Sequence, residues 1–198
     1  MKKLYFLITV MTLSAFTAWS QSPSENLIVN GDFQSGNQGF ISDYKYMEIS
    51  RFSLYREGVY NITSDPSYSH RDFRSMYDHT KGDSSGLYMA VNGMEALISS
   101  VVWKQTVTVQ SNTEYQLSVW VLTLQKDTAN LSRLQFEVDN QAIGTSFTVS
   151  AMETWQQHQF TWKSGNKTTV NIAILNLNSG YHGNDFAIDD IVLIPLKK

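Results

Sequence analysis

Residues 186–194 read Phe-Ala-Ile-Asp-Asp-Ile-Val-Leu-Ile (FAIDDIVLI), an apolar run with two carboxylates in its middle. Side chains alternate across a β-strand, so Phe186, Ile188 and Asp190 are expected on one face and Asp189 on the other. Each aspartate therefore interrupts an otherwise apolar row. An unpaired buried carboxylate is strongly destabilising. The stretch predicts a buried strand in which the two charges need partners from elsewhere in the chain.

Strand signals recur along the rest of the chain, and helical periodicity is almost absent. Clusters of Gly, Asn, Asp and Ser separate roughly nine or ten runs of alternating apolar and polar residues. The clearest runs are 99–109, 113–124, 133–139, 157–165 and 170–176. Even spacing and polar turns are typical of an antiparallel sandwich or barrel.

The first twenty residues have the pattern of a secretory signal peptide. Two lysines at positions 2 and 3 come before an apolar stretch, which ends in the small-x-small site Ala18-Trp19-Ser20. We therefore predict cleavage of residues 1–20, a single mature domain at 21–198, and a secreted or extracytoplasmic location in the periplasm or at the cell surface. An uncleaved membrane anchor is the competing interpretation, although the apolar stretch is short.

Composition excludes several classes of protein. The 198-residue chain has no cysteine, so a secreted domain of this kind relies on its core, on a metal, or on both. Its formal net charge of −3 argues against binding nucleic acid or an anionic membrane surface. After signal cleavage, no apolar run is long enough to span a bilayer.

The segment from about residue 34 to 86 differs from the strand-rich remainder, because it is polar, aromatic and irregular. Long loops on a rigid sandwich commonly carry function. The alternative is that its aromatic side chains form a second small core under the loops, since large aromatic residues are mostly buried.

Several motifs, in this order, resemble a known family. NLIVNGDFQSG, NTEYQLSVWV and FAIDDIVLI resemble the CenC-type carbohydrate-binding modules, which belong to the galactose-binding-like jelly rolls. The order of GFISDYKY, EGVYNI, DHTKGDSSGLYMAVNG, VVWKQTV and GNDFAIDDI resembles jelly-roll modules in secreted and surface proteins of the Bacteroidetes. The resemblance covers about residues 26–194. It implies an all-β antiparallel jelly-roll β-sandwich, often with a structural calcium, and a ligand site that varies between members.

The resemblance also implies a set of calcium ligands. The metal-facing aspartate of the last strand matches Asp189, and the usual first-strand glutamate is replaced by Gln34, which brings no charge. Further ligands are expected from Asp78 and Asp83 in the loop before residue 87, with Asp32 nearby. These oxygens suit a hard cation that takes 6–8 ligands.

An alternative explanation for the two aspartates of the last strand needs no metal. In it, Asp189 or Asp190 accepts hydrogen bonds from backbone N–H groups, or pairs with a Lys or Arg. Asp190 has no counterpart among the family's ligands, and we expect it near the rim of the sheet or bonded to backbone amides.

Familiar catalytic motifs are absent from the sequence. It contains no G-x-S-x-G, H-E-x-x-H, P-loop or G-x-G-x-x-G motif and no cysteine nucleophile, and its four histidines are scattered. A glycosidase needs two carboxylates flanking a cleft, and no spacing singles out such a pair. We therefore predict that the protein is not an enzyme, with a glycan-active hydrolase or lyase as a less favoured alternative.

Sugar binding has a definable requirement. Aromatic rings stack on the C–H face of a pyranose, while amides, carboxylates and guanidinium groups bond its hydroxyls. The candidate stacking residues are Tyr44, Tyr46, Tyr77, Trp103 and Tyr181; the candidate polar partners are Arg71, Asn92, Gln105, His182 and Asn184. Strand tryptophans such as Trp103 mostly pack in cores, which is the alternative.

These observations predict a secreted, non-catalytic, carbohydrate-binding-module-like domain with a structural calcium, which binds a polysaccharide or another glycan. The second hypothesis is a cell-surface structural or adhesion module that binds a protein partner.

Overall fold

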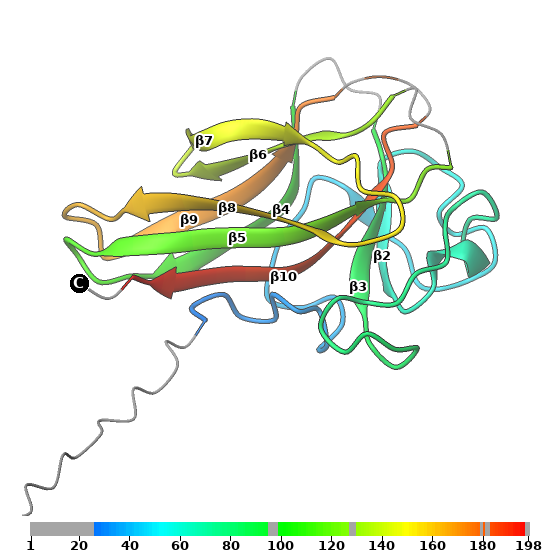
Figure 1. Cartoon of the computed structure of the whole chain (residues 1–198), viewed down its shortest axis with the longest axis horizontal. Coiled ribbons are helices and arrows are strands. Elements are labelled where there is room, and N and C mark those ends of the chain that lie inside the picture. Colours follow the sequence, from blue (N-terminus) through cyan, green and yellow to red (C-terminus); the bar gives the residue numbers. More distant parts are fainter. Residues whose placement is uncertain (1–25, 95–98, 127–129, 179, 181–182, 197–198) are drawn as a thin grey trace, which may run out of the picture.

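The computed structural model describes residues 26–94, 99–126, 130–178, 180 and 183–196 (Figure 1). The predicted signal peptide, Tyr181 and His182 lie outside these residues. Among the described residues, no helix is long and apolar enough to cross a membrane. The strands are β1 Lys45–Tyr46, β2 Val59–Thr63, β3 Tyr88–Asn92, β4 Ser100–Thr108, β5 Glu114–Thr123, β6 Arg133–Val138, β7 Gln141–Thr148, β8 Gln156–Lys163, β9 Thr169–Asn176 and β10 Phe186–Pro195; one 3-10 turn, η1, spans Pro66–Tyr68.

The strands form two sheets. A six-stranded sheet has the order β1-β2-β3-β10-β5-β8, and a four-stranded sheet has the order β4-β9-β6-β7. All pairings between neighbouring strands are antiparallel except the short parallel pair of β1 and β2. The architecture confirms the predicted all-β jelly-roll sandwich.

The main core lies between the two sheets, where alternation along each strand points one set of side chains inward. Phe186 and Ile188 of β10 and Trp103 of β4 all belong to this core, and all three are fully buried. Burying each such side chain contributes roughly 1.5–3 kcal/mol.

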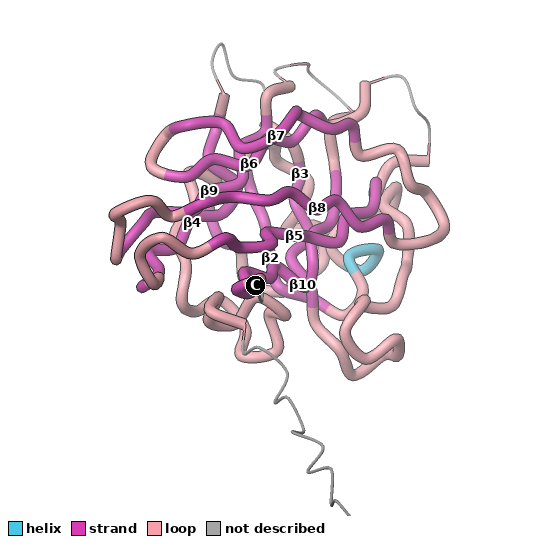
Figure 2. The backbone as a smooth tube through the Cα atoms, turned by 60° about the vertical axis from the view of Figure 1, so that its left-hand side comes forward, coloured by secondary structure: helices cyan, strands magenta, loops and turns pink. Residues whose placement is uncertain are grey.

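A second, smaller core covers the other face of the six-stranded sheet. Loop residues Leu54 and Phe73 pack there against Tyr88, Leu122 and neighbouring residues of β3 and β5. Figure 2 shows the segment that supplies this cover as mostly loop, interrupted by the short turn η1. The alternative predicted for the aromatic segment, a small core under the loops, is therefore correct for Phe73. Tyr55, Tyr68 and Tyr77 of the same segment stay exposed.

Strand β10 contains a β-bulge at the two aspartates. Its register against β5 shifts between Asp189 and Val192, and Asp190 has a left-handed φ of 45°. One extra residue in the strand reverses the alternation beyond it. Ile191 therefore joins Ile188 in the main core, and the prediction that Asp190 shares the face of Phe186 and Ile188 was wrong.

Candidate functional site

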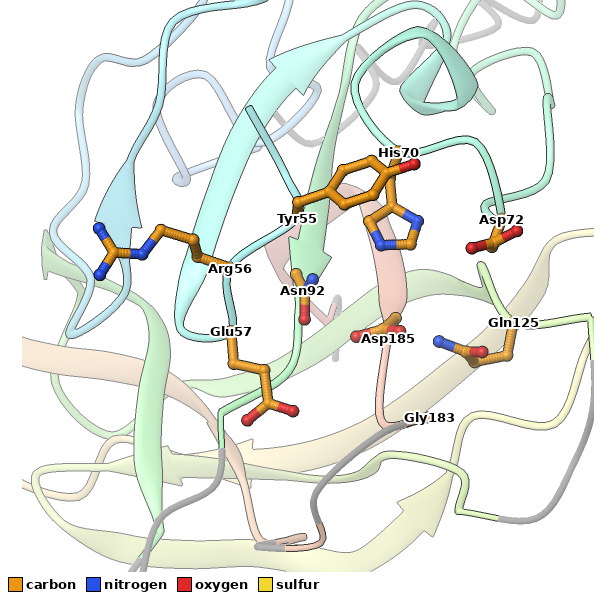
Figure 3. A pocket seen from close by; sticks show the side chains of 9 residues that line it. All are labelled: Tyr55, Arg56, Glu57, His70, Asp72, Asn92, Gln125, Gly183 and Asp185. Atoms are coloured by element: carbon orange, nitrogen blue, oxygen red, sulfur yellow. The ribbon is translucent and has the colours of Figure 1, made fainter. Parts of the chain in front are cut away.

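A pocket of about 600 Å³ opens where β3 ends and β10 begins (Figure 3). The chain brings five separate regions together there: the loop before β2, the loop after η1, the end of β3, the residues just after β5 and the approach to β10. The residues that line it are Tyr55, Arg56, Glu57, His70, Asp72, Asn92, Gln125, Gly183 and Asp185. The volume lies within the range of small-ligand sites in proteins.

A stack of three rings forms one wall of the pocket. The ring of His70 lies between those of Tyr55 and Phe73, with centroids 4.3 Å and 4.2 Å away, respectively. Phe73 is buried in the second core, whereas Tyr55 is 39% exposed. The stack therefore fixes the orientation of an accessible aromatic ring. Burial lowers the pKa of His70, which favours its neutral form.

Asp185 forms the buried part of the pocket floor. Its Oδ1 accepts the backbone N–H of Gly93 at 2.8 Å. Burial, with a smaller contribution from the charge of Glu57, raises the pKa of Asp185 to about 7. A Cβ added at Gly93 would lie 1.5 Å from Oδ1 of Asn184, so a larger residue does not fit at this position. The floor is therefore a preorganised polar surface.

The side chains around the floor are mostly acceptors and amides. Figure 3 shows the carboxylates of Glu57, Asp72 and Asp185 and the amides of Asn92 and Gln125 gathered around the cavity. The guanidinium of Arg56 points away from them. Asn92 is held in place because its amide donates to the carbonyl of Leu54 at 2.6 Å.

Three of the predicted ligand residues belong to this neighbourhood. Asn92 lines the pocket itself. Arg71 is exposed beside it and lies 3.6 Å from the carboxylate of Asp72. Asn184 is buried behind the floor, where its side chain bonds Asn176 and the carbonyl of Gly180.

Two predicted stacking residues are inside the protein. Trp103 is fully buried in the main core, and its indole N–H has no partner among the described residues. Tyr44 is also buried, and its hydroxyl accepts hydrogen bonds from Ser100 and Asn176. Neither ring is accessible to a sugar, so the alternative assignment to the core is correct for both.

The remaining predicted residues lie apart from the pocket. The Gln105 amide is buried and bonds the carbonyls of Val29 and Gly39, beside a second pocket of about 510 Å³. Tyr77 is exposed, and Tyr46 is half-buried against Tyr60. The structure therefore does not bring the predicted set together. Sequence reasoning missed Tyr55, Glu57, Asp72, Gln125 and Asp185, and the only signal for most of them was the irregular aromatic segment as a whole.

The predicted calcium ligand Gln34 donates hydrogen bonds. Its Nε2 lies 2.9 Å from the carbonyl oxygens of Asp32 and Leu87 and 3.3 Å from Oδ2 of Asp78. The buried Asp78 also accepts the backbone N–H groups of Lys81 and Gly82. N–H groups therefore occupy the positions from which a cation would be bound.

Asp189 is fully buried and is held by backbone amides. Its Oδ2 accepts the N–H groups of His79 at 2.8 Å and Thr80 at 3.3 Å, and its Oδ1 accepts that of Asp190 at 2.8 Å. Burial, together with the charge of Asp190, nevertheless raises the pKa of Asp189 to about 8. The contacts of Asp189 therefore match the alternative in which backbone N–H groups, and no metal, bond its carboxylate.

Asp190 is half-buried at the bulge of β10, and side chains hold it rather than the expected backbone amides. Its carboxylate contacts Nδ1 of His79 at 2.5 Å and accepts the Thr80 hydroxyl at 2.8 Å. The His79 ring stacks on Trp120 of β5, with centroids 3.8 Å apart. The loop at residues 78–82 therefore docks on the bulge of β10 and satisfies both aspartates.

The residues as placed do not fit a calcium ion. Among the described residues, no three His, Cys, Asp or Glu side chains are grouped to hold a metal. Asp83 is exposed and bonds the N–H and hydroxyl of Ser85 within its own loop. The predicted calcium stays a prediction, and the donor groups on Gln34 oppose it.

Comparison with known proteins places the fold. No protein-family model and no curated protein matches the chain. Among solved structures, the CBM22-1 xylan-binding domain of Paenibacillus barcinonensis Xyn10C is 12% identical, with a TM-score of 0.54 over 84% of this chain and 92% of that one. TmCBM61, solved with β-1,4-galactotriose, is 13% identical, with a TM-score of 0.54 over 87% and 100%. The Stig cyclase Fisc of Fischerella sp. TAU is 11% identical, with a TM-score of 0.57 over 88% and 98%.

These likenesses define the class of fold. The chain has the same jelly-roll fold as these carbohydrate-binding modules. Because cyclases have the same fold, the likeness alone does not choose between binding and catalysis. The finer resemblance to CenC-type modules and to the Bacteroidetes stays a prediction.

Proposed function

We propose that this protein is a secreted, non-catalytic glycan-binding module whose ligand occupies the pocket lined by Tyr55 and Asp185. The observation that carries the proposal is the exposed ring of Tyr55, fixed by stacking at the edge of a polar cavity. The carbohydrate-binding modules among the structural neighbours support it. The signal-peptide pattern of residues 1–20 supports export from the cytoplasm.

The pocket meets the chemical requirements of a sugar ligand. The face of Tyr55 suits the C–H face of a pyranose, and the rigid stack behind it limits the entropy lost on binding. Carboxylates of Glu57 and Asp72 accept hydrogen bonds from hydroxyls, while the amide of Gln125 both donates and accepts. The volume of about 600 Å³ suits a short stretch of glycan.

The charges of the pocket indicate which sugars it accepts. Three carboxylates line it, and the guanidinium of Arg56 points away from them. Uronic acids and sulfated sugars would bring like charges close to these groups, which is unfavourable. We therefore propose that the ligand is neutral or carries an amino group.

The test is binding to a panel of neutral, amino and acidic oligosaccharides, followed by calorimetry. Substituting Tyr55→Ala removes the stacking surface and should weaken binding about tenfold, because such contacts contribute roughly 0.5–1.5 kcal/mol beyond area burial. Tyr68→Ala is the matched control, since Tyr68 is exposed but does not line the pocket. A Tyr55→Ala variant that binds as tightly as the native chain would contradict this site.

Tyr77→Ala tests the other accessible aromatic. Tyr77 was predicted from the sequence to stack on sugars, and it is 59% exposed away from the pocket. We expect its replacement to leave affinity unchanged. If Tyr77→Ala loses binding while Tyr55→Ala retains it, the ligand lies on the loop beside Trp155, whose indole N–H donates to the Tyr77 carbonyl.

One observation favours glycan hydrolysis as a second candidate. A carboxylic acid with a pKa of about 7, as at Asp185, can donate a proton near neutral pH, and other carboxylates share its pocket. Incubation of the bound oligosaccharide with the protein distinguishes the two functions. A binding module returns the ligand intact, whereas release of reducing ends that is lost in Asp185→Asn would identify a hydrolase.

The alternative of a surface module for a protein partner has a different signature. It predicts no binding across the whole sugar panel and a stable complex isolated from an envelope fraction. That outcome would replace the glycan proposal without changing the fold.

A further inference from the structure

We propose that the side-chain amide of Gln34 takes the place of a cation. It does so at the junction between the first loop, residues 26–44, and the loop before β3, residues 69–87. The junction is then independent of metal, and the single change Gln34→Glu would turn it into a calcium site. This inference concerns residues that do not line the pocket and does not rest on the glycan proposal.

Three oxygens from two loops surround one nitrogen. The carbonyls of Asp32 and Leu87 each lie 2.9 Å from Nε2 of Gln34, and the Asp78 carboxylate lies 3.3 Å away. None of the three partner atoms can donate a hydrogen bond. A positively polarised centre is therefore required between them, and the amide N–H₂ group supplies it.

The same contacts determine which way the amide faces. The reversed amide would place Oε1 against two carbonyls and a carboxylate, all of them acceptors. That arrangement is tolerable only with a cation among the four oxygens. The choice is therefore between an N–H₂ group without metal and an oxygen with metal, and the two differ in their response to a chelator.

The neighbouring groups favour the metal-free form. The backbone N–H groups of Lys81 and Gly82 already donate to the Asp78 carboxylate, at 2.9 Å and 3.1 Å. Asp189 is likewise occupied by three backbone N–H groups. A cation at Gln34 would have one charged ligand, Asp78, and calcium affinity follows the number of charged ligands.

The geometry of the junction is fixed, which is what a metal site would need. A side chain at Gly86 would lie 2.0 Å from the Asp78 carboxylate, so the loop packs directly on that group. In Gln34→Glu, a second carboxylate would join Asp78 and the two carbonyls, which gives four oxygens in place. Water can complete the six to eight ligands of calcium.

The experiment measures thermal unfolding and calcium calorimetry on the full chain, after chelation and with added calcium. The native chain should show no calcium binding and the same Tm in both conditions. Gln34→Glu should have a lowered Tm after chelation, because two carboxylates then face each other. At calcium a hundredfold above Kd, its Tm should rise by about 5 °C or more.

The matched control is Gln38→Glu. Gln38 lies in the same loop, is exposed, and donates to the Ser35 carbonyl, so the substitution adds the same charge without facing Asp78. It should bind no calcium. One-to-one calcium binding by the native chain, with a Tm that falls on chelation, would overturn the proposal. So would a folded Gln34→Glu variant that binds no calcium. If that variant does not fold, the native chain alone decides between the two forms.

Discussion

At the scale of single residues, Asp185 shows how burial and one hydrogen bond set the charge of a group. It accepts one backbone N–H, from Gly93, which does not replace the water lost on burial. Its pKa rises from 3.8 to about 7. Asp189 has three backbone donors and yet a pKa of about 8, because it is more deeply buried and Asp190 is adjacent. The protonated, neutral form of Asp185 and of Asp189 therefore persists to a higher pH than it does in an exposed aspartate.

The raised pKa of Asp185 predicts how stability depends on pH. Between pH 4 and 7 the folded protein binds a proton at Asp185 that the unfolded chain has lost, so its contribution to stability falls as pH rises. Asp185→Asn keeps an acceptor for Gly93 and should stabilise the protein at pH 8 by roughly 2 kcal/mol, about half the value of a full three-unit shift. Urea unfolding at pH 5 and pH 8 measures the difference.

Asp139→Asn provides the control of opposite sign. The pKa of Asp139 is lowered, first by the Asn171 N–H and then by Lys167, so its contribution is present at neutral pH and lost as pH falls. Asp139→Asn should therefore lower the free energy of unfolding at pH 8 and leave it unchanged at pH 3. If Asp185→Asn also destabilises more at pH 8 than at pH 5, the neutral form of Asp185 is excluded.

Trp103 gives a second prediction at this scale. The side chain is fully buried, so Trp103→Ala should lower the free energy of unfolding by about 3–5 kcal/mol. Trp103→Phe should cost less, because it also removes an indole N–H that has no partner among the described residues. Denaturant unfolding checks both values, and glycan affinity of the folded Trp103→Phe variant should equal that of the native chain. Lost affinity with intact stability would restore Trp103 as a ligand residue.

At the scale of elements, the bulge in β10 shows where pattern reasoning succeeds and fails. The apolar run of residues 186–194 predicted a buried strand, and that prediction was confirmed. Alternation assigned Asp190 to the face of Phe186 and Ile188, because nothing in the sequence marks the extra residue between Asp189 and Val192. The partners of both aspartates come from the loop at 78–82, about a hundred residues earlier, so local sequence could not name them.

The same bulge makes Gly31 sensitive to substitution. The Ile191 N–H in β10 donates to the Gly31 carbonyl, and a side chain at Gly31 would lie 2.1 Å from the Ile191 carbonyl oxygen. Gly31→Ala must therefore separate the first loop from β10, and should cost about 2–4 kcal/mol. Thermal and urea unfolding measure the loss.

Gly36→Ala separates the effect of crowding from that of backbone conformation. Gly36 has a φ of +75° and nothing within 4 Å of an added Cβ, so only the left-handed conformation is penalised, at about 1 kcal/mol. If Gly31→Ala is as stable as Gly36→Ala, the first loop can move away from β10 without loss of stability, which would contradict the prediction.

At the scale of the whole molecule, the fold could be predicted and the pocket could not. Strand alternation and turn residues are local, so they predicted an antiparallel sandwich or barrel, and the family resemblance implied the two-sheet form that the structure has. The pocket combines Tyr55, Asp72, Gln125 and Asp185 from loops that meet only after the sheets have formed. Tyr55 and Tyr68 belong to the same aromatic segment, and only the stack with His70 distinguishes them.

The length of β10 also determines how far the pocket lies from the C-terminal end of the strand. Asp185 precedes the strand at the pocket, whereas Leu193, near its far end, accepts the N–H of Leu27 (Figure 1). At about 3.3 Å per residue, the two ends of the strand lie roughly 30 Å apart. A solid support coupled just beyond Pro195 would therefore hold the molecule by the side opposite the pocket. The ring of Tyr55 would then project toward whatever polymer passes in the surrounding solution.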